Sequence, residues 1–516
     1  MYVHIGFIVL SLILSVFFFI YGFNHYYLLF VARKYRSPKT VNFYGQRPPV
    51  CIHLPIYNEK YVVQRLLAAC TRGADEYGRE KVKILIVDDS DDDTVSVVDE
   101  LARDYLHDGY RIEVLRRGSR QGFKAGALQA ALECTDEEYI AVFDADFTPP
   151  ADFLLRALPY FLQDKSLGIV QSRWTHVNRN YNYLTRAIAI GIDVHFLIEQ
   201  TGRYAMGYFQ NFNGSGGVLR TKALVEAGGW QADTLAEDLD VSYRIQLLGY
   251  RLLYLKDLQS PGEVPPTVPS FKRQQARWAC GSLRTARKIL PTLLADRELG
   301  FMKRLQAFIH LTGYMVHPLM FFSYVLTFLA IFIGADSFRV PHINQLIQYN
   351  RNLGAIGISS LTLLQNIVWV MFGLMILICT SAVWISPIVI LKIQGFPIPR
   401  NLSSLVVLFL LGFGVSVSNT LEAGKALFTN RNWVFQRTPK YAVQYEKEEW
   451  KDKKYQVPIG FLTYLELIFV CLGILAIADA IWHLNFGVLL ILIPYTSAYA
   501  FVFSLTILQS YQERVE

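Results

Sequence analysis

The sequence predicts an α/β domain with a parallel, doubly wound sheet, combined with an α-helical transmembrane region. Between residues 49 and 146, short apolar runs alternate with amphipathic helical stretches, a pattern typical of such sheets. Acidic residues follow several of the apolar runs, as expected where ligands bind beyond the carboxyl ends of the strands. Hydrophobic residues concentrate at the start of the chain and from about residue 305 onward, which indicates membrane spans.

The composition fits this division. The chain has 516 residues, of which 52% are apolar, and a formal charge of +7. That length leaves room for a soluble domain and a membrane region. Positive charge mostly follows the apolar spans, as on the cytoplasmic side of membrane proteins, and no block of like charge indicates a nucleic-acid partner. The six cysteines are scattered without C-x-x-C pairs, which favours buried thiols in a reducing compartment.

The first apolar run, residues 5–23, is long enough to cross a bilayer core of about 30 Å. A signal peptide is the alternative, but the run lacks a charged segment before it and a small-residue cleavage site after it. Basic residues follow it at 33–36. We therefore expect residues 1–31 to form an N-terminal transmembrane helix.

The α/β domain is expected to occupy residues 32–300. Its first elements alternate, with strands expected at 49–59, 82–90, 110–117 and 139–146, and helices at 60–73 and 123–134. Asp88 and Asp89 end the second strand. In a parallel sheet this position lies at the ligand-binding edge.

Asp144 and Asp146 stand one residue apart at the end of the fourth strand. Alternation directs both side chains to one face, where a hard divalent cation would relieve their repulsion and leave positions for phosphate oxygens. Lys124, shortly upstream, is suited to a diphosphate. A solvated turn is the alternative, because D-x-D is common in proteins.

Two later motifs are ambiguous when each is taken alone. The glycines within residues 211–220 let the backbone approach a ligand closely, or they form a plain turn. Glu237, Asp238 and Asp240 begin a helical stretch, where acids stabilise the macrodipole without any catalytic role.

A third motif, "QQARWACG", covers residues 274–281. It places Gln274, Arg277 and Trp278 within about one helical turn. An amphipathic surface helix is the alternative interpretation.

In their order, these motifs resemble those of the processive glycosyltransferases of family 2, which include cellulose, chitin and hyaluronan synthases. They are most similar to the cellulose synthase-like mannan and glucomannan synthases. The resemblance is carried by "VDDSDDDT", "FDADFTP", "FNGSGGVLR", "AEDLDVSYR" and "QQARWACG". It covers residues 48–290 closely and the membrane part by layout. It implies a GT-A (nucleotide-diphospho-sugar transferase) fold and a hexosyltransferase that inverts the anomeric centre of a nucleotide sugar.

The resemblance also implies how the donor is bound. Asp88 or Asp89 would hold the nucleotide base and ribose, and Asp144 would contact the nucleotide sugar. Asp146 would bind Mg²⁺ or Mn²⁺ together with the diphosphate. The other residues implied on the diphosphate side are Lys124, Gln274 and Arg277.

On the acceptor side, Asp238 matches the general base of the family, and Glu237 would orient or contact the acceptor. The family's preceding threonine is Ala236 here, which puts one supporting hydrogen bond in doubt. The remaining residues implied at the acceptor are Trp278, which would stack on the sugar, and Asn213, Gly214 and Ser215.

The membrane part is expected in three sections: an interface helix and two spans (301–393), a cytoplasmic interface helix and loop (394–456), and two C-terminal spans (457–516). The apolar run at 402–420 decides the number of spans. If it crossed, a basic loop would lie outside, which the positive-inside rule disfavours. We therefore predict five spans, with six as the alternative.

The stretch "FQRTPK" begins at residue 435. It resembles the F-x-V-T-x-K gating loop of bacterial cellulose synthase, with Arg437 in place of the valine. The resemblance implies that Phe435, Thr438 and Lys440 enter the site over bound nucleotide, with Thr438 and Lys440 suited to phosphate. A solvated loop between spans is the alternative.

The leading hypothesis is a multi-pass enzyme that elongates, and translocates, a β-linked polysaccharide. Its donor would be UDP-glucose or GDP-mannose, with UDP-glucose slightly favoured, and its partners a glycan acceptor and the lipid bilayer. The catalytic domain would be cytoplasmic, at a plasma (inner) membrane or a Golgi membrane. One alternative is a non-processive, ceramide glucosyltransferase-like enzyme that makes a glycolipid. Another is a transporter or scaffold that retains a degenerate transferase domain.

Overall fold

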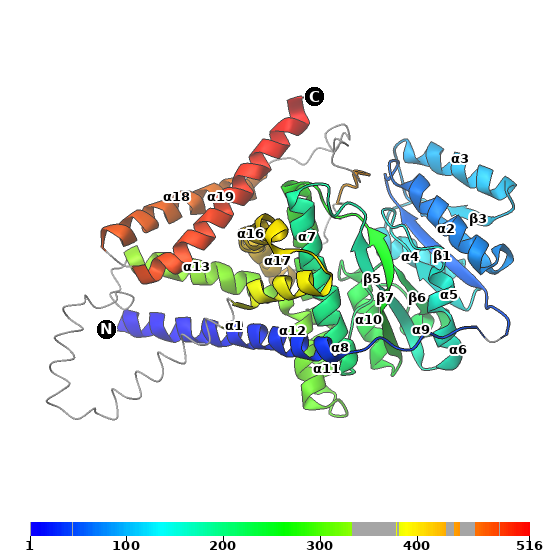
Figure 1. Cartoon of the computed structure of the whole chain (residues 1–516), viewed down its shortest axis with the longest axis horizontal. Coiled ribbons are helices and arrows are strands. Elements are labelled where there is room, and N and C mark those ends of the chain that lie inside the picture. The colour runs from blue at the N-terminus through cyan, green and yellow to red at the C-terminus, as the bar shows by residue number, and fades with distance from the viewer. Residues whose placement is uncertain are drawn as a thin grey trace. The chain divides into compact units, whose positions relative to one another are not determined.

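The computed structural model describes residues 2–43, 45–332, 378, 381–429, 438–443, 460–483 and 486–515. The chain divides into two compact units (Figure 1). One, here called the α/β unit, comprises residues 28–313 and 424–455. The other, here called the helical unit, comprises residues 1–27, 314–423 and 456–516.

The α/β unit contains one seven-stranded sheet, in the order β3-β2-β1-β4-β6-β5-β7. Its strands are β1 (Val50–Ile56), β2 (Val82–Asp88), β3 (Arg111–Leu115), β4 (Tyr139–Val142), β5 (Leu167–His176), β6 (Gly217–Arg220) and β7 (Arg251–Gly262). The four strands predicted from the apolar runs are present as β1 to β4. The α/β fold class is confirmed.

The sheet is mixed: the parallel arrangement expected from the sequence holds for the four predicted strands but not for β6. Strands β1 to β4 are parallel to one another, and β5 is parallel to β7, but β6 runs antiparallel to both β4 and β5. Val142, the last residue of β4, pairs with Gly217, the first of β6. The loop before β6 therefore lies at the carboxyl end of β4. Because β6 starts at that end, it must run antiparallel to β4.

Helices cover the sheet and continue the chain beyond it. In the α/β unit they are α2 (Val63–Tyr77), α3 (Thr94–His107), α4 (Phe123–Glu133), α5 (Phe153–Ala157), α6 (Pro159–Gln163), α7 (Tyr183–Val194), α8 (Thr201–Ala205), α9 (Thr221–Glu226), α10 (Glu237–Leu247), α11 (Val268–Ala295) and α12 (Phe301–Leu311). The others are α1 (Tyr2–Lys34), α13 (Val316–Phe332), α16 (Ile398–Gly414), α17 (Ser416–Phe428), α18 (Phe461–Trp482) and α19 (Phe486–Val515). The helices predicted at 60–73 and 123–134 correspond to α2 and α4.

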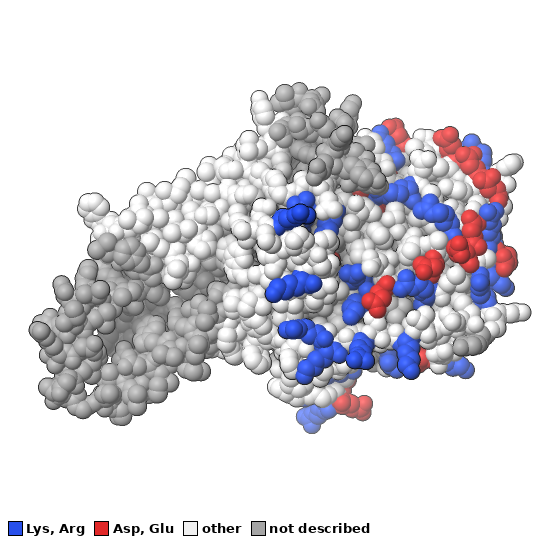
Figure 2. Space-filling view, viewed as in Figure 1, with Lys and Arg blue, Asp and Glu red and all other residues white. Residues whose placement is uncertain are grey.

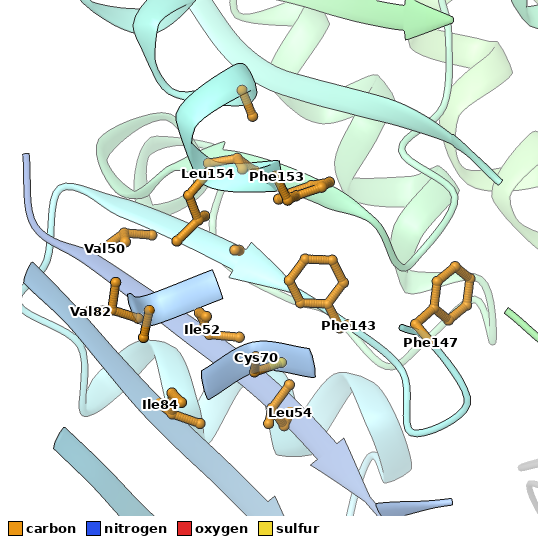
Figure 3. Packing of buried hydrophobic residues seen from close by; sticks show 14 of the residues in the cluster. Val50, Ile52, Leu54, Cys70, Val82, Ile84, Phe143, Phe147, Phe153 and Leu154 are labelled. Carbon is orange, nitrogen blue, oxygen red and sulfur yellow. The ribbon is translucent and has the colours of Figure 1, made fainter. Parts of the chain in front are cut away.

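The main core of the α/β unit lies between the sheet and α2 and α5. In Figure 3, alternate residues of β1 and β2 face Cys70 of α2, and Phe153 and Leu154 of α5 belong to the same cluster. Cys70 is 1% exposed and Phe153 is 2% exposed. This packing fixes the strands, and with them the loops at their carboxyl ends.

Several described helices are long and apolar enough to cross a membrane. Four qualify alone, Val9–Lys34, Ile398–Phe428, Phe461–Trp482 and Val488–Tyr511, and the bent pair Phe301–Leu311 with Gly313–Leu329 makes up to five. Most charged side chains on the face drawn in Figure 2 lie over the α/β unit. This supports a multi-pass membrane protein.

The predicted number of spans stays a prediction. Most of the span expected at 362–391 lies outside the described residues. The run at 402–420, expected at the cytoplasmic leaflet, belongs to the helix Ile398–Phe428, which by length and composition alone could cross. The domain limits assigned from the sequence likewise stay predictions.

Candidate active site

Asp144 and Asp146 follow β4 directly and are each held by a different lysine. Asp144 Oδ1 lies 2.6 Å from Lys124 Nζ, and its side chain is 31% exposed. Asp146 is 1% exposed, and its Oδ2 lies 2.7 Å from Lys440 Nζ. Asp146 Oδ1 is buried and has no hydrogen-bond partner among the described residues. One buried carboxylate oxygen is therefore left for a ligand.

Lys124 connects the D-x-D motif to the acids at the start of α10. Its Nζ donates to Gly214 O at 3.0 Å and lies 3.6 Å from Glu237 Oε1, in addition to its ion pair with Asp144. Burial alone would lower the pKa of Lys124, but the negative charges of Asp144 and Glu237 outweigh it and raise that pKa. Lys124 therefore stays cationic, as contact with a diphosphate requires.

Asp238 lies at the first turn of α10 and is partly exposed. Burial and the charge of Glu237 raise the pKa of Asp238 to about 7, against the lowering effect of Lys124 and Arg277. Its Oδ1 accepts a hydrogen bond from the Leu239 N–H at 2.8 Å. A carboxylate with a pKa near 7 is suited to accept a proton at neutral pH.

The loop of Asn213, Gly214 and Ser215 touches three of these groups. Gly214 has φ +81°, and a Cβ there would lie 2.8 Å from Asp238 Oδ2 and 3.3 Å from Lys124 Nζ. Ser215 Oγ accepts from the Asp144 N–H at 3.0 Å. Only glycine has both the backbone freedom and the small volume that position 214 requires.

Asn213 contacts a residue that sequence reasoning missed. His195 Nε2 lies 3.2 Å from Asn213 Oδ1, and His195 Nδ1 lies 3.3 Å from Glu199 Oε2. His195 begins a π-helical turn, His195–Gln200, between α7 and α8. Residues 183–205 read as one uninterrupted helix, so no local signal in the sequence marks this turn.

Helix α11 supplies the Q-x-x-R-W residues. Gln274 is 6% exposed, and its Oε1 has no hydrogen-bond partner among the described residues. Arg277 acts electrostatically on Asp238, which places it at the same site, and Trp278 is partly exposed. Gly281 allows the close approach, because a Cβ there would lie 2.8 Å from Ala236 Cβ.

Asp88 and Asp89 are already paired with arginines that the sequence analysis did not single out. Asp88 is buried, and its Oδ2 accepts from Arg116 Nε at 3.1 Å and Nη2 at 3.0 Å. Asp89 pairs with Arg117 through both carboxylate oxygens. If Asp88 and Asp89 contact the nucleotide, they must do so while paired with these arginines. Both arginines directly follow β3.

Part of the "FQRTPK" stretch reaches the same site. Phe435 lies outside the described residues, whereas Thr438 and Lys440 lie within them. Thr438 is 6% exposed, and its hydroxyl has no hydrogen-bond partner among the described residues. Lys440 contacts Asp146, and that carboxylate raises the pKa of Lys440 against the lowering effect of burial.

The residues fit Mg²⁺ or Mn²⁺ only together with a phosphate-bearing ligand. Among the described residues, no group of three or more His, Cys, Asp or Glu side chains could hold a metal ion by itself. Asp146 Oδ1, which has no partner in the described part of the chain, is an oxygen of the kind that these hard cations prefer. Diphosphate oxygens and water would have to supply the other ligands.

Comparison with known proteins identifies the family and supports the fold. A model of "Glycosyl transferase family group 2" matches residues 139–413, and one of "Glycosyl transferase family 2" matches residues 51–223. The chain resembles a mannosyltransferase from Pyrobaculum calidifontis in complex with GDP-Man and Mn2+. That likeness has a TM-score of 0.51 and 19% identity, and covers 72% of this chain and 97% of that one. It supports the predicted GT-A-like fold.

Plant proteins are more similar in sequence. The chain is 38% identical over 265 residues to probable glucomannan 4-beta-mannosyltransferase 7 of Oryza sativa subsp. japonica, covering 50% of this chain and 45% of that protein. It is 33% identical over 342 residues to probable glucomannan 4-beta-mannosyltransferase 1 of Arabidopsis thaliana, covering 62% and 61%. The chain thus spans about half the length of the curated relatives it matches. Since the first family model covers more than half of the chain, this protein belongs to glycosyl transferase family group 2.

Proposed function

We propose that this protein is a membrane-bound, inverting hexosyltransferase that elongates a β-linked polysaccharide from a nucleotide sugar. The observation that carries the proposal is the bridge made by Lys124 between Asp144 of the D-x-D motif and Glu237, the neighbour of Asp238. It brings a diphosphate-binding group and a carboxylate with a pKa of about 7 to one edge of the sheet.

In the proposed reaction, Asp238 accepts the proton of the acceptor hydroxyl as that oxygen attacks the anomeric carbon of the donor. Lys124 and Lys440 neutralise charge on the leaving diphosphate, and the Thr438 hydroxyl and the Gln274 amide hydrogen-bond to it. Trp278 gives the acceptor sugar a flat face, and Asn213 orients it. A divalent cation at Asp146 would supply Lewis-acid stabilisation of the same diphosphate.

The donor we favour is GDP-mannose. The curated relatives are named as glucomannan mannosyltransferases, and the Pyrobaculum calidifontis enzyme was solved with GDP-Man. UDP-glucose remains the second donor, because a glucomannan contains both sugars. The proposed location is a plasma or Golgi membrane, with the catalytic domain in the cytoplasm.

Product analysis tests this function. Purified, detergent-solubilised protein is incubated with Mn²⁺ or Mg²⁺ and labelled GDP-mannose, UDP-glucose or UDP-GlcNAc, each alone and as the first two together. We expect long chains that β-mannanase cleaves, made from GDP-mannose. Transfer of a single hexose to added lipid would instead establish the glycolipid alternative. Donor binding without any transfer or hydrolysis would favour the scaffold alternative.

A further inference from the structure

Glu263 lies beside the proposed diphosphate site but belongs to none of the motifs discussed above. It directly follows β7 and is 8% exposed. It contacts three parts of the α/β unit that are far apart in sequence: Arg65 of α2, Asp146 after β4, and Ala442. Glu263 thus connects three segments of the α/β unit.

The main chain of Glu263 orients Asp146. The Glu263 N–H donates to Asp146 Oδ2 at 2.9 Å, the same oxygen that Lys440 Nζ approaches at 2.7 Å. Two donors thus fix one oxygen, while Oδ1 has no partner among the described residues. The carboxylate is held so that one oxygen faces the ligand.

The side chain of Glu263 uses both of its oxygens. Oε1 accepts from Arg65 Nη2 at 2.7 Å, and Oε2 accepts from the Ala442 N–H at 3.2 Å. Arg65 Nη2 also donates to the Asp146 carbonyl at 3.2 Å. Two donors therefore converge on one side chain, and a carboxylate is the side chain that offers two acceptor oxygens and no donor.

Residues 438–443, here called the docked segment, have further contacts in the α/β unit. Tyr441 is fully buried, its hydroxyl lies 3.0 Å from Ser270 Oγ, and it packs with Tyr181 and Val443. Ala442 has φ 55°, which only the surrounding contacts can maintain in a residue other than glycine. The bond from the Ala442 N–H to Glu263 lies within this strained turn, two residues after Lys440.

We propose that Glu263 is a positioning residue that docks this segment and thereby sets the Lys440 ammonium against Asp146. The main-chain N–H of Glu263 binds Asp146, and its side chain binds the turn at Ala442 that follows Lys440. The part of the inference that concerns donor binding rests on the proposed function. The docking itself does not.

Hydrogen–deuterium exchange of the full-length protein, without donor or metal, tests the docking. In Glu263→Gln, one acceptor oxygen is replaced by an NH₂ group that must face Arg65 or the Ala442 N–H. We expect exchange in the peptide that contains residues 438–443 to rise at least about tenfold, because the protecting hydrogen bond is lost. Exchange in β1 and β2 should stay unchanged, which shows that the fold is intact.

Two further variants keep the test decisive. Glu263→Asp keeps the charge beside Arg65 but shortens the side chain, so it should also expose the segment even if Glu263→Gln does not fold. Ala442→Gly retains the N–H and accepts the positive φ, so it should leave exchange unchanged. Wild-type exchange rates in both Glu263 variants would overturn the inference.

A double-mutant cycle tests the connection to the donor. Lys440→Ala should raise the donor KM about tenfold through loss of a charge-assisted contact, and Glu263→Gln should do the same by releasing Lys440. The double variant should be no worse than Lys440→Ala alone, whereas a product of the two single effects would overturn the connection. If the wild-type protein transferred no sugar from any donor, the proposed function would fail, and the exchange experiment would still decide the docking.

Discussion

The charge on Asp238 is the most finely balanced feature of the site. Burial and Glu237 disfavour the carboxylate, whereas Lys124 and Arg277 favour it, and the net result raises the pKa of Asp238 to about 7. The threonine that precedes this acid pair in the resembling family is replaced by Ala236, so a hydrogen bond that would lower that pKa is missing. The reactivity of this residue is therefore set by its neighbours.

The pH dependence of turnover follows from this pKa. A general base is active when deprotonated, so kcat/KM should rise with pH and level off above about 7, the value to which the pKa of Asp238 is raised. Asp238→Asn should lose about 10²- to 10⁴-fold in kcat while it binds donor normally. Initial rates between pH 5 and 9, with donor binding measured by calorimetry, check both. Substantial polymer synthesis by the variant would remove Asp238 as the base.

The same pKa predicts an effect on stability. Because the pKa of Asp238 is raised from its ordinary 3.8 to about 7, the folded protein binds a proton more tightly than the unfolded chain between these values. Stability contributed by the protonated acid is therefore lost as the pH rises through 7. Asp238→Asn should raise the unfolding temperature above that of the wild type by more at pH 8 than at pH 5, because the loss begins above pH 3.8 and is complete only above about 7. An equal shift at both pH values would contradict this.

Gly214 can be tested against a matched glycine. Gly214→Ala should reduce kcat about 100-fold, the loss expected when reacting groups move by about 1 Å, since the new Cβ would meet Asp238 and Lys124. Gly207 is the control: its φ is +67°, similar to the +81° of Gly214, but nothing lies within 4 Å of a Cβ there. Gly207→Ala should carry only the backbone strain. Equal losses of activity in both variants would show that strain, not the contact with Asp238, is responsible.

At the scale of elements, the sequence predicted the strands and helices that have a local pattern of apolar and polar residues. Apolar runs marked β1 to β4, and acids at their ends marked the edge at which we propose that the donor binds, because the carboxyl ends of parallel strands meet there. The antiparallel direction of β6 was not predictable, since its four residues carry no signal of their own and its direction follows from where the preceding loop leaves β4.

The residues that the sequence missed act through contacts between distant segments. Arg116 and Arg117 reach Asp88 and Asp89 from the neighbouring strand. Glu263 joins residues that are 117 and 179 positions away. No spacing rule relates such positions, so only the folded chain reveals them.

The docked segment illustrates the same limit. Its motif predicted the participation of Thr438 and Lys440 by resemblance, and the structure puts Lys440 on Asp146. The Tyr441 hydroxyl on Ser270, which anchors the segment, follows the motif and was not anticipated. The sequence identified the residues with chemistry suited to phosphate. Only the tertiary contacts identified the residues that keep them in place.

At the scale of the whole molecule, the site should depend on a divalent cation. Asp146 Oδ1 has no partner among the described residues, and Lys124 and Lys440 would neutralise a leaving diphosphate only in part. EDTA should abolish transfer, and Mn²⁺ or Mg²⁺ should restore it. In Asp146→Asn, restoration should need at least about tenfold more Mn²⁺, because a neutral amide oxygen replaces a charge-assisted ligand. Full activity in EDTA would mean that the two lysines suffice.

The docked segment also constrains the membrane topology. It lies within the α/β unit, through Lys440 on Asp146 and Tyr441 on Ser270, so residues 438–443 must be on the same side of the membrane as the catalytic site. The chain between residue 313 and residue 438 must therefore cross an even number of times. If α13 and the predicted span at 362–391 both cross, the helix Ile398–Phe428 does not, in agreement with five spans.

Cysteine labelling with a membrane-impermeant maleimide in intact cells decides this parity. Phe428 is 86% exposed at the end of α17, and Trp482 is 84% exposed at the end of α18. In a background without other exposed cysteines, Phe428→Cys should react only after permeabilisation. A separate variant that keeps only the native, exposed Cys134 of the catalytic unit should behave in the same way. Trp482→Cys, one crossing further along, should react in intact cells. Reaction of Phe428→Cys in intact cells would contradict the contact of Lys440 with Asp146, because the residues between 428 and 438 are too few to cross a bilayer.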